Sequence, residues 1–441
     1  MSAHHQQTYR DKLCTPAQAA ALIPPGAKVT MPIAAGQPPA LLAALADRAR
    51  GGVLSDVRFY YLLSTGIAGT SVFAPDLIDR LIPMSYFHSG VERALDLRRD
   101  AAPVEFVPCH FSQVPRSMVE HVGVDTLIAT VAPMDETGHF SLGVSVDYAL
   151  AVARRPGARI ILEVNPHMPT VRGDCTIPLA AVTALIEHAA SLPQIPAAPP
   201  APADEAIGAI IAGLVEDGAC LQMGIGALPD AVCARLTGHR HLGIHTELMT
   251  PGLAALMRAG AVDNSRKQIH AGQSVYTFAL GDQALYDFLD HNPAVAAWPV
   301  EYVNDPATIA RNDRVVSVNA TVQIDLQGAC NSEFVRGHQF SGSGGQVDFV
   351  RGAYASRGGL SIIACHATAA GGTISRIVPT LEGPVTTPRN DTHIVVTEFG
   401  WTCLKGKSVV ERARALIGIA HPDFRESLER AAFPQGLRVP A

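Results

Sequence analysis

Several features of secreted, membrane and nucleic-acid-binding proteins are missing from this sequence. Its eight cysteines include no Cys-x-x-Cys pair and no zinc-like spacing, which indicates reduced cysteines in the cytosol. Basic residues do not outnumber acidic ones (34 against 40), so there is no basic footprint for nucleic acid. The first residues contain no apolar h-region, so we expect no signal peptide, and no apolar run is long enough to cross a bilayer. We therefore expect a soluble cytoplasmic protein that binds neither nucleic acid nor membranes.

The composition predicts a large folded protein with more than one domain. Apolar residues make up 48% and charged residues 17% of 441 residues, which favours extensive cores over disorder. Residues 191–203 contain five prolines, which cannot continue a helix or a central strand. We interpret this stretch as a Pro/Ala-rich linker between an N-terminal domain (1–190) and a C-terminal domain (204–441), with a long surface loop as the alternative.

The two halves of the chain resemble each other. Residues 26–35 align with residues 218–227, and each segment leads to a proline, a helical pattern and a second apolar run. Later, His88-Ser-Gly is echoed by His270-Ala-Gly. This recurring order indicates a duplicated α/β unit.

Short apolar runs alternate with helical patterns along both halves. Runs that are apolar on both faces are typical of buried parallel strands. We therefore predict two similar open α/β domains with mainly parallel sheets. The predicted strands include 124–131, 158–164, 361–365 and 393–397, and the predicted helices include 178–192, 204–215, 281–289 and 409–419.

The histidines around residue 241 do not predict a metal site. His241 and His245 have the spacing of a zinc pair on a helix, and Glu247 follows them. Residues 242–244 read instead as a strand, which would separate the two imidazoles by about 13 Å. We expect no metal site in this protein.

A glycine-rich loop and a carboxylate form the strongest candidate site. The loop consists of Gly224, Ile225, Gly226, Ala227 and Leu228. Glycines allow backbone N–H groups to approach a ligand and to face developing negative charge. If 221–223 and 242–246 are neighbouring parallel strands, the loop and Glu247 leave the same sheet edge. A carboxylate beside such donors suits acyl transfer.

Two other interpretations of this loop stay open. It is either a tight turn whose glycines serve backbone geometry alone, or part of a dinucleotide-binding motif. The second requires a third glycine, and Pro229 occupies that position. Glu247 itself is otherwise a solvated carboxylate at a strand end.

A second glycine cluster contains Gly342, Gly344 and Gly345, which free the backbone to cradle a bulky ligand. Glu163, at the end of a strand in the first half, either lines a substrate or caps its strand. Four basic residues are candidates for phosphate contacts, although isolated basic residues are usually solvated. They are Arg351, Arg376, Lys405 and Lys407.

With these segments assembled, the chain resembles the acetyl-CoA hydrolase/transferase family, the branch of family I CoA-transferases that includes 4-hydroxybutyrate CoA-transferase. The resemblance covers nearly the whole chain. Relatives commonly carry a Leu-Pro-Ser-like run where this chain has 365–367, which leaves the acyl preference open. The segments that carry the resemblance are 141–148, 163–166, 223–230, 243–247, 341–349, 372–379 and 421–424.

The resemblance implies that Glu247 becomes a glutamyl-CoA thioester and that 224–228, together with Gly342, Gly344 and Gly345, bind CoA. It implies transfer of CoA between a short acyl-CoA such as acetyl-CoA and a small carboxylic acid, with no permanently bound cofactor. Hydrolysis of acyl-CoA by the same glutamate is the first alternative. An NAD-dependent oxidoreductase and a silent acyl-CoA-binding protein are further alternatives. We expect a homodimer.

Overall fold

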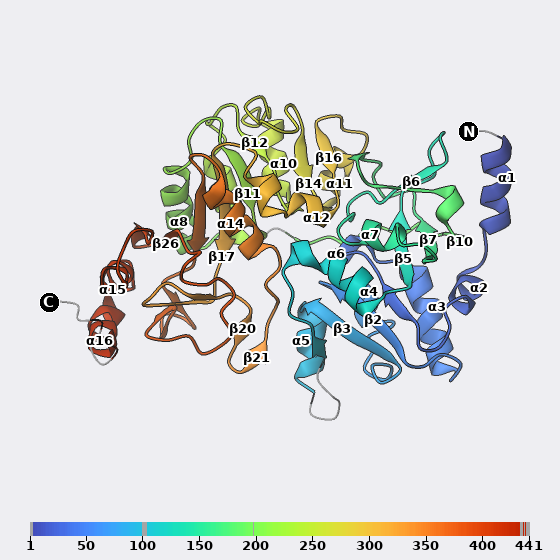
Figure 1. Cartoon of the computed structure of the whole chain (residues 1–441), viewed down its shortest axis with the longest axis horizontal. Coiled ribbons are helices and arrows are strands. Elements are labelled where there is room, and N and C mark those ends of the chain that lie inside the picture. The colour runs from blue at the N-terminus through green and yellow to red at the C-terminus, as the bar shows by residue number, and fades with distance from the viewer. Residues whose placement is uncertain (1–2, 99–103, 197, 433–434, 436, 438–441) are drawn as a thin grey trace. The chain divides into compact units, whose positions relative to one another are not determined.

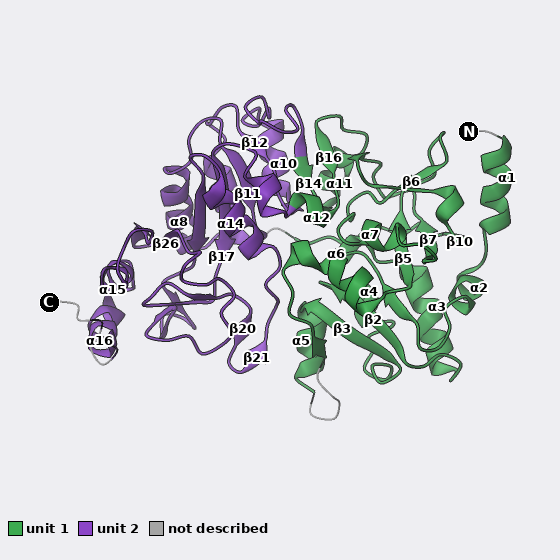
Figure 2. Cartoon of the chain, in the orientation of Figure 1, with its two compact units in different colours: residues 1–196, 275–303 green, residues 197–274, 304–441 purple. Residues whose placement is uncertain are grey.

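The computed structural model describes residues 3–98, 104–196, 198–432, 435 and 437. Contacts divide the chain into two compact units, shown in Figure 2. Unit 1 comprises residues 1–196 and 275–303, and unit 2 comprises residues 197–274 and 304–441. The division falls inside the predicted linker 191–203, of which residue 197 lies outside the described residues. Residues 275–303 pack with the first unit, although they follow the predicted boundary in sequence. The domain limits 1–190 and 204–441 stay predictions.

Unit 1 is built on a seven-stranded sheet in which all described pairings are parallel. Several of its strands are labelled in Figure 1. In spatial order the strands are β10 (Ala184–Glu187), β7 (Arg159–Val164), β5 (Thr126–Val131), β1 (Lys28–Thr30), β2 (Val57–Leu62), β3 (Leu81–Phe87) and β4 (Glu105–Phe106). Its helices include α1 (Ala3–Lys12), α2 (Pro16–Ala21), α3 (Pro39–Arg50), α4 (Gly66–Gly69), α5 (Gly90–Asp96), α6 (Val114–Arg116), α7 (Ala149–Ala153), α11 (Gln283–Leu289) and α12 (Val300–Val303). Shorter strands are β6 (His139–Ser141), β8 (Arg172–Gly173), β9 (Thr176–Pro178), β14 (Ser274–Tyr276), β15 (Phe278–Ala279) and β16 (Val295–Ala297).

Unit 2 is built on a six-stranded sheet that is parallel except for its last strand. In spatial order the strands are β12 (Gly243–Ile244), β11 (Cys220–Met223), β17 (Val315–Ala320), β22 (Leu360–Ala364), β26 (Ile394–Thr397) and β27 (Gly400–Cys403). The helices are α8 (Pro202–Ala212), α9 (Ala227–Arg235), α10 (Pro251–Arg258), α13 (Pro306–Ile309), α14 (Gln346–Ala355), α15 (Val409–Gly418) and α16 (Pro422–Ala432) among the described residues. Shorter strands are β13 (Leu248–Met249), β18 (Gln323–Asp325), β19 (Cys330–Asn331), β20 (Phe334–Val335), β21 (His338–Gln339), β23 (Thr368–Ala369), β24 (Ile374–Ser375) and β25 (Ile377–Val378).

The two sheets share a strand order. In unit 1, β1 has β2 on one side and β5, β7 and β10 in succession on the other. In unit 2, β11 has β12 on one side and β17, β22 and β26 on the other. The aligned segments 26–35 and 218–227 each supply the central strand of this pattern. The prediction of two similar α/β units with mainly parallel sheets is therefore confirmed.

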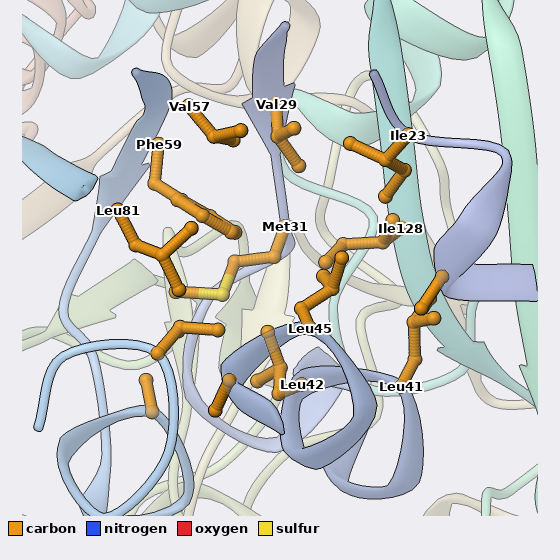
Figure 3. Packing of buried hydrophobic residues seen from close by; sticks show 14 of the residues in the cluster. Ile23, Val29, Met31, Leu41, Leu42, Leu45, Val57, Phe59, Leu81 and Ile128 are labelled. Carbon is orange, nitrogen blue, oxygen red and sulfur yellow. The ribbon is translucent and has the colours of Figure 1, made fainter. Parts of the chain in front are cut away.

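The core of unit 1 shows why its strands are apolar on both faces. Leu41, Leu42 and Leu45 form the buried stripe of α3 and lie against Val29 and Ile128 of the sheet, as Figure 3 shows. All five side chains are inaccessible to solvent. Burial of a large apolar side chain contributes about 1.5–3 kcal/mol, so this stripe fixes α3 on the sheet.

Most predicted elements are confirmed, including β5, β7, β22, β26, α8, α11 and α15. The predicted helix over 178–192 is wrong. Residues 184–187 instead form β10, which pairs with β7 in register, so that Leu185 faces Leu162. Burial and strand pairing override the helix propensity of its alanines and leucine. Among the described residues, no helix combines the length and the apolar character needed to cross a membrane.

Candidate active site

Glu247 lies just beyond the carboxyl end of β12, at the margin of the unit 2 sheet. β11 and β12 are parallel neighbours, with Leu221 opposite Ile244 (Figure 1). Because parallel strands end at the same edge, the loop that starts at Gly224 and the segment that carries Glu247 leave this sheet together. The prediction that the strands before the loop and before Glu247 are parallel neighbours is therefore confirmed.

The carboxyl group of Glu247 is held by two residues from distant parts of unit 2. Its Oε2 atom accepts a hydrogen bond of 2.7 Å from Nδ2 of Asn304. At Gly345, a Cβ atom would lie 1.9 Å from Oε2 of Glu247 and 2.1 Å from Nδ2 of Asn304. Any side chain at position 345 would therefore displace the carboxyl group. No arginine or lysine forms an ion pair with Glu247 in the described part of the chain.

The electrostatic setting makes Glu247 a weakly stabilised anion. Loss of solvation raises the pKa of Glu247 to about 7, and the nearby Asp348 carboxylate acts in the same direction. Hydrogen bonds from Asn304 and from the backbone of Gly345 favour the charged form and partly offset this shift in pKa. A carboxylate that is poorly solvated but still ionisable near neutral pH is a more reactive nucleophile than a solvated one.

Asn304 was not predicted from the sequence. It lies 57 residues after Glu247 and is fully buried. Its Oδ1 atom has no hydrogen-bond partner among the described residues. A buried amide normally uses both ends, so Oδ1 is an acceptor that a ligand can satisfy. The sequence around Asn304 carries no motif, and only the fold brings it to Glu247.

The first glycine loop leads into helix α9, with Gly226 as the N-cap residue. Gly226 has φ 118°, a conformation that favours glycine. No side chain caps this helix, and both Ile225 and Gly226 are exposed. The N–H groups of Ala227 and Leu228 in the first turn are therefore without a side-chain acceptor from the described residues.

Unit 1 caps the corresponding helix. The carboxyl of Glu163 on β7 accepts hydrogen bonds from the N–H groups of Ala40 (3.2 Å) and Leu41 (2.9 Å) in the first turn of α3. Glu163 is thus a helix cap. When the units are aligned through their central strands, the strand registers place Ala364 of unit 2 where unit 1 has Glu163. Unit 2 has no carboxylate at that position.

The second glycine cluster lies at the start of α14. Gly345 is the N-cap residue of this helix and lies against the carboxyl group of Glu247. Gly344 has φ 50°, which allows the sharp turn before the helix. Gly342 and Gly344 are buried beside it in the chain. The structure therefore brings Gly345 to the carboxylate from a loop almost a hundred residues away in sequence, while a role for Gly342 and Gly344 in binding stays a prediction.

The four basic candidates differ in how far other residues already engage them. Arg351 is paired with Asp391 at 2.9 Å, and Lys405 donates to a backbone carbonyl and lies 4.0 Å from the ring centroid of Tyr354. Arg376 is half-buried and donates to the carbonyls of Thr368 and Thr321. No carboxylate lies within ion-pair distance of it among the described residues. Lys407 lies in the turn before α15.

The histidines near the site are engaged elsewhere. Nδ1 of His241 lies 2.8 Å from a carboxylate oxygen of Asp263 at the surface, while His245 is fully buried near Phe349. Within the described ranges, no group of three or more histidine, cysteine or acidic residues is arranged to hold a metal ion.

Comparisons with known proteins identify the family of the chain. The family models for the acetyl-CoA hydrolase/transferase N-terminal and C-terminal domains match residues 1–196 and 281–432. A succinyl-CoA:cyclohexane-1-carboxylate CoA transferase from Geobacter metallireducens is 42% identical, covering 97% of this chain and 96% of the relative. A 4-hydroxybutyrate coenzyme A transferase from Clostridium kluyveri is 39% identical over 96% and 97% of the two chains. The crystal structure of RipA from Yersinia pestis aligns with a TM-score of 0.96 and 51% identity over 99% of this chain and 100% of that one. The chain belongs to the acetyl-CoA hydrolase/transferase family.

Proposed function

We propose that this protein is a CoA-transferase that moves CoA from an acyl-CoA to a small carboxylic acid, with Glu247 as the covalent nucleophile. The observation that carries the proposal is the setting of Glu247: a desolvated carboxyl group, held by Asn304 and enclosed by Gly345, at the edge where a glycine loop also emerges. The relatives from Geobacter metallireducens and Clostridium kluyveri are named as CoA transferases, which supports the same reaction class here.

The reaction requires four exchanges at three carbonyl carbons, those of the donor acyl group, of Glu247 and of the acceptor acid. The Glu247 carboxylate attacks the acyl-CoA carbonyl, the C–S bond breaks, and an acyl-glutamyl anhydride and CoA thiolate result. The thiolate attacks the glutamyl carbonyl, which releases the first carboxylate and leaves a glutamyl-CoA thioester. The acceptor carboxylate then repeats both exchanges in reverse and leaves as its CoA ester. No electron or net proton transfer is needed, and none of these steps calls on a metal ion or a redox cofactor.

Each exchange passes through a tetrahedral oxyanion that needs hydrogen-bond donors. The N–H groups of Ala227 and Leu228, and that of Gly226 before them, are our candidates, because α9 has no side-chain cap and unit 2 lacks the carboxylate that fills the corresponding position in unit 1. The positive end of the helix dipole adds to this effect. In this assignment, Gly224 and Ile225 approach the pantetheine arm, and the free Oδ1 of Asn304 accepts one of its amide N–H groups.

Arg376 is our candidate for the CoA phosphates. It contacts the carbonyls of Thr321 and Thr368, which follow β17 and β22 at the carboxyl edge. With adjacent strands about 4.8 Å apart, these positions lie roughly 10–14 Å along the edge from the strand that carries Glu247. The phosphates of CoA are remote from its thiol, and an arginine without a carboxylate partner suits them.

Acyl-CoA hydrolysis is the second candidate function, since the same glutamyl thioester would then be cleaved by water. The two functions are separated by measuring acetyl-CoA loss with and without a panel of carboxylic acids. Loss that depends on an acceptor acid, with formation of its CoA ester, supports the transferase. Rapid loss that ignores every acceptor would establish the hydrolase instead. Protection from heat by NAD rather than by CoA would support the oxidoreductase alternative.

The experiment that tests Glu247 is mass spectrometry after incubation with acetyl-CoA and treatment with borohydride, which reduces a thioester. We expect the modification at Glu247. The control carboxylate is Glu333, which is buried and accepts hydrogen bonds from Thr386 (3.2 Å) and Gln339 (3.5 Å). Reduction at Glu333 would overturn the assignment. If Glu247→Ala still turns over acyl-CoA at the wild-type rate, the covalent mechanism is wrong; a silent acyl-CoA-binding protein would bind CoA without turnover.

A homodimer in the cytoplasm and the absence of a permanently bound cofactor stay predictions. Light scattering after gel filtration tests the homodimer. An absorption spectrum and metal analysis of the purified protein test the absence of a bound cofactor. Unit 1 and unit 2 have equivalent sheets, but only unit 2 carries the Glu247 site. A single polypeptide therefore contains every residue that we assign to the chemistry.

A further inference from the structure

The strand that leads to Glu247 lies at the edge of its sheet. Among the described residues, β12 is the last strand on its side of the unit 2 sheet, and β11 is its one strand neighbour there. On the side of β11, the N–H groups of Gly243 and His245 donate hydrogen bonds to the backbone carbonyls of Ala219 (2.8 Å) and Leu221 (3.1 Å), respectively. In a parallel strand the backbone groups of alternate residues point to opposite sides, so those of Ile244 face away from the sheet.

Two side chains replace the missing neighbour strand at Ile244. The N–H of Ile244 donates to Oδ1 of Asn264 at 2.9 Å. The carbonyl of Ile244 accepts from Nζ of Lys267 at 2.8 Å, and the same ammonium donates to the carbonyl of Gln273 at 2.6 Å. Asn264 and Lys267 both belong to the loop between residues 263 and 274. This loop thereby satisfies both outward backbone groups of the edge strand.

Lys267 is an unusual choice for such a structural contact. Its side chain is only 6% exposed, and no carboxylate lies within ion-pair distance of Nζ among the described residues. Burial lowers the pKa of Lys267 to about 8, since the charged form has lost solvation. Burying an ammonium group costs free energy unless its hydrogen bonds compensate for the lost solvation. The backbone makes room for it, because a Cβ at position 243 would lie 2.7 Å from Cγ of Lys267, so the glycine there permits the contact.

We propose that Lys267 is a positioning residue for the nucleophile: by fixing the Ile244 carbonyl it sets the direction in which the chain leaves β12 and so places the carboxyl of Glu247 against Asn304 and Gly345. The inference rests on the proposed role of Glu247. Only two residues lie between Ile244 and Glu247, and a shift of about 1 Å in a reacting group can reduce a rate about 100-fold. Lys267 does not touch the reacting atoms in this scheme.

The test compares Lys267→Met and Lys267→Arg with the wild type in steady-state and single-turnover assays. We expect Lys267→Met to lower kcat by about 10–100-fold with KM for acetyl-CoA within about 2-fold, because orientation is lost while the binding surface is kept. Lys267→Arg retains a buried cationic donor, and we expect it to recover part of the rate. The rate of thioester formation at Glu247, followed by borohydride reduction, should fall in parallel with kcat.

Lys12 supplies the matched control. Its ammonium also bridges backbone carbonyls, those of Leu179, Ala180 and Val182, but it does so in unit 1 and far from Glu247 in sequence. We expect Lys12→Met to keep the wild-type kcat. Equal kcat losses in Lys12→Met and Lys267→Met would show a general loss of structure and overturn the proposal. If Lys267→Met does not fold, Lys267→Gln, which keeps a neutral donor, is measured in the same way. A wild-type kcat in Lys267→Gln would also overturn the proposal.

The pH dependence gives an independent measure. Deprotonation of Lys267 weakens its hold on Ile244, so kcat of the wild type should decline above about pH 8 and that decline should move to higher pH in Lys267→Arg. The other titratable groups that face Lys267 are Cys220 on β11 and His270 in the same loop. An unchanged alkaline limb in Lys267→Arg would refute the positioning role. If the wild type forms no thioester at Glu247, the proposed function itself fails; if it forms one and Lys267→Met forms it equally fast, only the inference about Lys267 fails.

Discussion

Oε2 of Glu247 and Nδ2 of Asn304 lie 2.7 Å apart, although 57 positions separate the two residues. The amide donates to a carboxylate that has lost much of its solvation, and it favours the charged form that must act as the nucleophile. The contact therefore bears on two quantities at once, namely the orientation of the carboxylate and the fraction of it that is ionised at neutral pH.

Replacement of Asn304 by alanine should impair the enzyme most at low pH. A hydrogen bond to a charged group contributes about 1.5–3 kcal/mol, so we expect kcat/KM at pH 7 to fall by roughly 10–100-fold. Part of the loss should be recovered at pH 8.5, where Glu247 ionises without help. Asn292→Ala is the control, since Nδ2 of Asn292 also donates a hydrogen bond, but to the backbone carbonyl of Phe288 at 2.9 Å and not to a carboxylate. If the loss in kcat/KM does not vary with pH, Asn304 orients the carboxylate but does not affect its ionisation.

A methyl group at position 345 should abolish activity without unfolding the protein. In Gly345→Ala the new Cβ would lie 1.9 Å from Oε2 of Glu247, so the carboxyl must leave its place. We expect kcat to fall at least about 100-fold, as misplacement of a reacting group predicts. Gly238→Ala is the control, because a Cβ there meets no atom within 4 Å. Circular dichroism should show folded protein for both variants. Near-normal turnover by Gly345→Ala would contradict the geometry of the site.

The sequence predicted the strand pattern and the glycine loops better than it predicted the surroundings of Glu247. Apolar runs bounded by turns indicate buried parallel strands, and the aligned segments 26–35 and 218–227 indicated the duplication. Asn304 escaped because hydrogen bonds between residues far apart in sequence leave no local pattern. Glu163 was predicted to line a substrate or to cap its own strand, and the fold shows a third role, since its carboxyl caps the first turn of α3. The false helix over 178–192 has a similar cause, since pairing with β7 is not visible in local composition.

The raised pKa of Glu247 predicts opposite effects of pH on activity and stability. Since the pKa is about 7 in the folded protein and 4.5 for a fully solvated glutamate, kcat/KM should rise with pH up to about 7. The folded state binds more protons than the unfolded state between these two values, so ionisation of Glu247 removes stability as pH rises from 4.5 to 7.

Glu247→Gln stays neutral and escapes this loss. We expect it to be inactive but more stable than the wild type by about 1–3 kcal/mol at pH 8, with a smaller difference at pH 4.5. Thermal unfolding of both proteins at the two pH values checks the prediction. If the variant is less stable than the wild type at pH 8, the carboxylate is stabilised by its surroundings and the description of Glu247 as a weakly stabilised anion is wrong.

Arg376 should matter for CoA but not for a thioester that lacks phosphates. Its guanidinium contacts only backbone carbonyls among the described residues, those of Thr368 (3.3 Å) and Thr321 (3.5 Å). We expect Arg376→Ala to raise KM for acetyl-CoA by about 5–50-fold, in line with the loss of one charge-assisted contact, while kcat/KM for S-acetyl-N-acetylcysteamine is unchanged. Arg351→Ala is the control, because Asp391 already engages that arginine. Equal losses with both thioesters would mean that Arg376 supports the fold of the sheet edge, since binding energy from the remote phosphates can be lost only with a substrate that has them.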